Sequence, residues 1–91
     1  MLNAKFRDCI EACKRCADAC NTCSVACLQE ENVAEMSRCV RLDLDCAAIC
    51  RLAVSAMVRD SEFSKAICQL CADLCEACAE ECNKHDHEHC Q

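Results

Sequence analysis

Apolar residues recur along this chain at alternating intervals of three and four, and many of them are cysteines. Between Cys9 and Cys27 the steps are four, three, four, three and four, which is the period of the buried face of a packed helix. Charged side chains occupy many of the positions between them. The pattern predicts an amphipathic helix whose buried face consists of thiols: Cys9, Cys13, Cys16, Cys20, Cys23 and Cys27.

Two further segments repeat this period. The second row contains fewer thiols, and the third is nearly saturated with them. The second row is Met36, Cys39, Asp43, Cys46, Cys50, Ala53 and Met57, and the third is Cys68, Cys71, Cys75, Cys78, Cys82, His85 and His89. Cys90 lies outside the rows. Charged residues beside the rows, including Glu80 and Glu81, are assigned to a solvated outer face.

These rows predict an all-α fold with helices over about 4–29, 32–59 and 61–84, followed by a stub over 85–91. Asn32 with Glu35 three residues later has the pattern of a capping box, and Asp60 or Ser61 is expected to cap the third helix. The joints are short enough only for antiparallel neighbours. We expect residues 1–91 to form one helical bundle domain.

Composition supports long helices around a thin aliphatic core, since the chain has 15 cysteines and neither Gly nor Pro. A formal charge of -6 and only two aromatic residues, both Phe, argue against binding nucleic acid or an anionic membrane surface. No secretory signal or apolar run of spanning length is evident. The expected location is the reducing cytoplasm, where thiols stay free.

Thiols three or four residues apart on a helix can turn toward one ion between them. Cu(I) is a soft ion that thiolates select, and each thiol that releases its proton is matched by one arriving positive charge. A buried array of tetrahedral Zn²⁺ sites with four thiolates each would instead accumulate negative charge. The residues therefore favour multiple Cu(I) ions per chain as cargo.

Other uses of these cysteines remain alternatives to copper storage. A zinc reservoir and a copper chaperone or detoxification protein are the nearest, and a disulfide-stapled helical protein is a third. Parallel side chains on one helix face have poor geometry for disulfides. An enzyme is not expected, because equivalent rows of thiols present no distinguished nucleophile.

Several other residues in the rows are candidate accessory ligands. The thioethers of Met36 and Met57 could pass Cu(I) inward, or they could be ordinary core residues. Burying an unpaired carboxylate is unfavourable in free energy. Asp43 is therefore expected either to lie at an open, hydrated position or to have a charged partner. His85, His87 and His89 are either ligands at the mouth of the bundle or part of a solvated tail.

The strings CIEACKRCADACNTC, CVRLDLDCAAICRLAVSAM, ICQLCADLCEACAEEC and KHDHEHCQ together resemble the cytosolic copper storage proteins. The resemblance implies a four-helix bundle that stores many Cu(I) ions, with three full helices and a stub of the fourth in this chain. It also implies a homo-oligomer, often a tetramer. The implied metal ligands are the fifteen cysteines, namely Cys9, Cys13, Cys16, Cys20, Cys23, Cys27, Cys39, Cys46, Cys50, Cys68, Cys71, Cys75, Cys78, Cys82 and Cys90.

In similar proteins HCQ opens a fourth cysteine-bearing helix, whereas Gln91 is the last residue here. Three rows of thiols leave one side of the metal core uncovered, and exposed thiols invite oxidation and association. We therefore expect another chain to close that side. Val54, Val58 and Phe63 are candidates for contacts between chains, or for packing between helices of one bundle.

Overall fold

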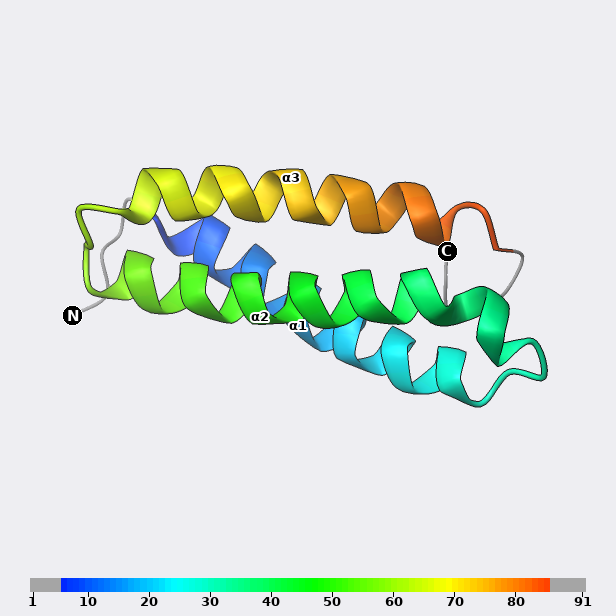
Figure 1. Cartoon of the computed structure of the whole chain (residues 1–91). Coiled ribbons are helices and arrows are strands. Elements are labelled where there is room, and N and C mark those ends of the chain that lie inside the picture. The colour runs from blue at the N-terminus through cyan, green and yellow to red at the C-terminus, as the bar shows by residue number, and fades with distance from the viewer. Residues whose placement is uncertain (1–5, 86–91) are drawn as a thin grey trace.

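The structure is a computed structural model, and it describes residues 6–85. Within that range the chain forms α1 (Arg7–Leu28), the short 3-10 helix η2 (Val33–Met36), α2 (Ser37–Val58) and α3 (Ser64–Cys82). Figure 1 shows the long helices lying lengthwise beside one another, and the described part measures about 45 × 20 × 15 Å. The predicted all-α antiparallel fold is confirmed; the stub over 85–91 lies almost wholly outside the described residues.

The sequence explains why the helices are long. No Gly or Pro interrupts them, and the three-and-four spacing of their small apolar residues gives each one a continuous face to bury. Between residues 6 and 85, no helix is both long and apolar enough to cross a membrane. Helix stability must come chiefly from packing of these faces against each other.

The start of α2 differs from the prediction. Asn32 does not cap it: the side-chain amide of Asn32 donates to Glu35 Oε2 at 3.1 Å, and the backbone N–H of Glu35 donates to the Asn32 carbonyl at 2.9 Å. These bonds begin the 3-10 helix, and α2 starts only at Ser37. The tighter turn places Met36 fully in the core.

The α2–α3 corner is closed by a Schellman motif that uses Asp60 where a glycine is usual. Asp60 has φ of 54°, its N–H donates to the Met57 carbonyl at 3.1 Å, and the N–H of Ser61 donates to the Ala56 carbonyl at 2.9 Å. Asp60 therefore ends α2 and does not cap α3. Ser61 Oγ instead accepts from the N–H of Phe63, and α3 begins at Ser64.

The middle helix, α2, packs against both neighbours, and it has the most fully buried side chains. Figure 1 shows α2 and α3 running side by side in opposite directions. The buried core is made of small side chains and sulfur atoms, with Ile10, Met36 and Met57 as its largest apolar members. Such a core is compact but offers donor atoms where other bundles place leucine.

Candidate metal centre

The core consists of layers in which α1, α2 and α3 each contribute a donor atom. The layers are evenly spaced because α2 and α3 are antiparallel and have matching intervals between their donors. The intervals are four, three and four residues from Cys39 to Cys50 along α2, and the same from Cys82 back to Cys71 along α3. Among residues 6–85, four groups of donor atoms result, each with its ligand atoms within 4.8 Å of one another. They are Cys13, Cys50 and Cys71; Cys16, Cys46, Cys50 and Cys75; Cys20, Asp43 and Cys78; and Cys23, Cys39, Asp43 and Cys82.

The central layer brings sulfur atoms from all three helices into contact. Cys16 Sγ lies 3.7 Å from both Cys46 Sγ and Cys75 Sγ, and the last two are 2.9 Å apart. Cys50 is shared between this layer and the next, because its Sγ lies 3.9 Å from Cys75 and 3.5 Å from Cys71. Sharing of ligands makes the layers a continuous row of donors instead of isolated sites.

Asp43 occupies a position in α2 where the register would place a cysteine. Only 1% of it is exposed, and its Oδ1 accepts from Cys78 Sγ at 3.0 Å. Weaker contacts of 3.8 Å from Cys39 and 3.9 Å from Cys82 surround the same carboxylate. Thiols, and no cationic side chain among residues 6–85, supply these hydrogen bonds. The carboxylate is buried at the wall of a cleft that opens between α1 and α3.

Burial keeps the thiols protonated in the metal-free protein. It raises the pKa of Cys13 and of Cys20 to about 12 and that of Cys75 to about 11, from an ordinary 9.0. A thiolate would lose its hydration in this core, and neighbouring sulfur atoms would repel it. Burial also raises the pKa of Cys23, Cys39, Cys46, Cys50, Cys68 and Cys78.

One side of the sulfur row opens into a cleft between α1 and α3. The cleft has a volume of about 310 Å³, and Cys16, Cys20 and Cys75 are among the residues that line it. A second cleft of about 500 Å³ lies toward the start of α1, where Cys9 and Cys68 contribute to its wall. Ions can therefore reach the thiols through these two clefts.

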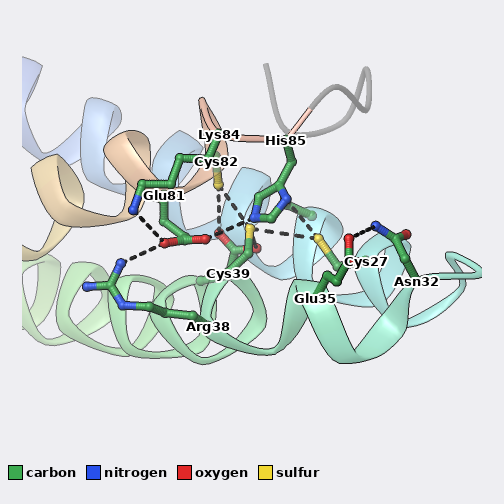
Figure 2. Close-up of polar contacts among 11 residues, drawn as sticks. Cys27, Asn32, Glu35, Arg38, Cys39, Glu81, Cys82, Lys84 and His85 are labelled. Atoms are coloured by element: carbon green, nitrogen blue, oxygen red, sulfur yellow. Dashed lines mark hydrogen bonds and ion pairs between the residues drawn. The ribbon is translucent and has the colours of Figure 1, made fainter.

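At the Cys82 end, a cluster of charged and imidazole groups lies over the last layer of sulfur atoms (Figure 2). Glu81 Oε1 accepts from Arg38 at 2.7 Å, and Glu81 Oε2 lies 2.9 Å from His85 Nε2. The bond from Arg38 lowers the pKa of Glu81 to about 2, helped by His85 and Lys84. The outer-face prediction is wrong for Glu81: its side chain is only 8% exposed.

Sequence reasoning missed Glu81 as part of the site because it lies one residue away from the row. The spacing could have indicated it. Glu81 is three residues after Cys78 and four before His85, so the three side chains lie on overlapping parts of one helix face. Glu80, its neighbour, is exposed as expected. The acid that faces the metal core can be recognised only once the helix rotation is known.

The remaining predicted residues divide by burial. Met36 and Met57 are fully buried in the core, and Cys9 is exposed at the second cleft. The cysteines up to Cys82 are present as free thiols. His85 lies close to the layer containing Cys27, Cys39 and Cys82 (Figure 2), whereas His87, His89 and Cys90 lie outside the described residues.

A bundle with stacked layers of buried thiols is a container for soft metal ions, and comparison with known proteins names the family. The family model for the copper storage proteins matches residues 2–91. The chain belongs to the copper storage protein family.

Individual relatives agree with that assignment. The Bacillus subtilis (strain 168) protein called "uncharacterized cysteine-rich protein YhjQ" is 60% identical over 83 residues, which cover 91% of this chain and 77% of the relative. The structure of Cu(I)-bound copper storage protein BsCsp3 matches with a TM-score of 0.90 and 58% identity, over 94% of this chain and 81% of that one. The structure of the copper storage protein Ccsp from Streptomyces lividans, loaded with 10 copper equivalents, matches with a TM-score of 0.87 and 43% identity. The match covers 91% of this chain and 67% of that one.

Proposed function

We propose that this protein stores multiple Cu(I) ions in its bundle core. The observation that carries the proposal is the continuous row of donor atoms, four groups in which the ligand atoms lie within 4.8 Å of one another. Thiolates prefer Cu(I), and shared ligands such as Cys50 allow ions to be added side by side. Membership of the copper storage family and the copper-loaded relatives support the same function.

Charge balance favours filling the row with a monovalent ion. The thiols are neutral when the protein is empty, so each can lose its proton as one Cu(I) arrives and the core stays close to neutral. Divalent zinc in sites of four thiolates would leave excess negative charge in a buried row. The thiols act here as ligands, because burial raises the pKa of thiols such as Cys13, Cys20 and Cys75 and keeps the nucleophilic thiolate form scarce.

We propose the fifteen cysteines as the ligands, with oxygen, nitrogen and thioether atoms completing some sites. Asp43 belongs to two of the four donor groups. The accessory ligands we propose are Asp43, Met36, Met57, His85, His87 and His89.

An anaerobic titration of the reduced protein with Cu(I), against a competing chelator, tests the proposal. We expect roughly ten or more tightly held ions per chain, with helicity retained on loading. One or two ions would identify a chaperone or sensor instead. If Cu(I) is ignored and Zn²⁺ binds at about one ion per four cysteines, the protein is a zinc reservoir.

We also propose that the protein works in the cytoplasm as a homo-oligomer. Free thiols persist in a reducing compartment, and the Streptomyces lividans relative is described as cytosolic. The cleft between α1 and α3 leaves the sulfur row accessible, so a second copy that covers it would shield Cys16, Cys20 and Cys75 from oxidation.

Sedimentation of the copper-free protein at micromolar concentration tests the assembly. We expect a species larger than the monomer, and alkylation of Cys20 that slows as the protein concentration rises. Cys9 is exposed at the other cleft and serves as the internal reference for alkylation. A folded monomer whose Cys20 reacts at a concentration-independent rate contradicts this assembly.

A further inference from the structure

Glu81 is held at the Cys82 end of the bundle by a side chain of α2 and by another from the turn that follows α3. Arg38, at the start of α2, reaches one carboxylate oxygen at 2.7 Å, and Lys84 reaches the same oxygen at 3.5 Å. The side chains of Arg38 and Lys84 are more than half exposed, whereas that of Glu81 is 8% exposed. The carboxylate therefore lies beneath its cationic partners, on the side toward the core.

The second carboxylate oxygen faces an imidazole. His85 Nε2 lies 2.9 Å from Glu81 Oε2, and the His85 side chain is only 14% exposed. A carboxylate oxygen can only accept, so Nε2 must carry the proton of this hydrogen bond. In a neutral imidazole the lone pair then resides on Nδ1, the atom through which such a ring can bind a metal.

The imidazole ring of His85 lies beside sulfur atoms of the core, where its lone pair could bind a metal ion together with them. Figure 2 shows the imidazole between the Glu81 carboxylate and the sulfur of Cys27, above Cys39. These sulfur atoms already touch one another, with Cys27 Sγ 3.8 Å and Cys82 Sγ 3.2 Å from Cys39 Sγ. Because each of the three helices contributes one of these sulfur atoms, a ring fixed here faces three sulfur atoms that are linked through Cys39.

We propose that Glu81 is a positioning residue for copper capture at this end of the bundle. It holds His85 with the proton on Nε2, so that Nδ1 is directed at the layer of Cys27, Cys39 and Cys82, and Arg38 fixes Glu81 in turn. Carboxylates that orient a ligating histidine have this role in other metal sites. The inference rests on the proposed Cu(I) function and extends it to a group that binds no copper itself.

The first test is made on the copper-free protein, so it does not depend on copper storage. Nitrogen NMR of the histidine side chains identifies which ring atom is protonated, and His85→Ala assigns the His85 signals. We expect protonated Nε2 in the wild type and a mixture of tautomers in Glu81→Ala. Glu81→Gln should keep the wild-type tautomer, because its amide oxygen still accepts. Glu80→Ala, an exposed neighbour, is the matched control.

The second test follows transfer of the first Cu(I) equivalent from a chelator. We expect Glu81→Ala to slow capture or weaken the first site by about tenfold, and Glu81→Gln to restore most of it. The double variant Glu81→Ala/His85→Ala should be no slower than His85→Ala alone, because Glu81 acts through His85. Total copper capacity should be unchanged in Glu81→Ala, which separates this role from the storage function.

The proposal is overturned if Glu81→Ala leaves the tautomer and the first capture step unchanged, or if its effect persists without His85. Circular dichroism checks that each variant is folded. Should Glu81→Ala lose helicity, Arg38→Gln replaces it: this change removes the exposed partner of the same carboxylate and should shift the tautomer in the same direction. An unchanged tautomer in a folded Arg38→Gln protein would refute the part assigned to Arg38.

Discussion

Cys78 donates its S–H to the carboxylate of Asp43, with 3.0 Å between Sγ and Oδ1, although the residues lie on different helices and are 35 apart in sequence. This contact places a negative charge among thiols that burial has already made weak acids. The charge raises the pKa of Cys78 further, after burial itself, and does the same for Cys23. Asp43 thus helps to keep the metal-free core protonated.

Asp43→Asn should raise the free energy of unfolding of the copper-free protein by about 1–2 kcal/mol. The asparagine side chain keeps an oxygen that accepts from Cys78, but it removes a buried charge that has no cationic partner within the structure's described residues. Chemical denaturation followed by circular dichroism measures the change. Asp45→Asn, on the exposed face of α2, should change stability by no more than about 0.5 kcal/mol. Loss of stability in Asp43→Asn would show that the core requires the charge.

The copper-free protein should lose stability above pH 9 and unfold as the pH approaches 12. The folded-state pKa of Cys75 is about 11 and that of Cys13 about 12, against an ordinary 9.0. Below pH 9 the thiols are protonated in both states, so they add no pH dependence. Above pH 9 the unfolded chain releases protons that the folded chain retains. The free energy of unfolding therefore falls by about 1.4 kcal/mol per thiol for each pH unit.

Helicity measured across an alkaline titration checks this expectation. Copper-loaded protein is the comparison, because its thiols have already lost their protons and should show little change over the same range. Helicity that persists without copper to pH 12 would contradict the raised pKa values.

Asp60→Gly should stabilise the protein by about 0.5–1 kcal/mol. Asp60 has φ of 54°, a left-handed conformation that strains a residue with a Cβ atom but not glycine. Arg59→Gly is the matched control, since Arg59 has ordinary right-handed angles and gains nothing from glycine there. Thermal unfolding of both variants measures the difference. Equal effects at the two positions would mean that the motif stores no strain.

Much of this arrangement could be predicted from the spacing of residues. The three-and-four steps predict the helices and their buried faces. The steps from Cys39 to Cys50 equal those from Cys82 back to Cys71, so they also indicate how α2 and α3 are aligned against each other. The ends of the helices could not be predicted as well, because local hydrogen bonds such as that between Asn32 and Glu35 decide them. Rotation of a helix by a fraction of a turn likewise decides whether Glu81 faces solvent or the core.

The layered core also predicts unequal roles for the cysteines. Cys46 is fully buried and belongs to the four-sulfur group with Cys16, Cys50 and Cys75, whereas Cys9 is exposed and belongs to none of the four groups. Cys46→Ala removes a donor that lies 2.9 Å from Cys75 and leaves a small void. Loss of one ligand from such a group should release roughly one or two ions to a strong chelator.

Cys9→Ala is the control for this comparison, because it removes one thiol from the periphery. We expect it to retain the tightly held copper and to lose at most about one weakly held ion. Anaerobic titration against chelators of graded affinity separates the two classes of ion. If both substitutions release the same amount of copper to the strongest chelator, the ions are distributed evenly along the thiols and the buried layers have no privileged role in retention.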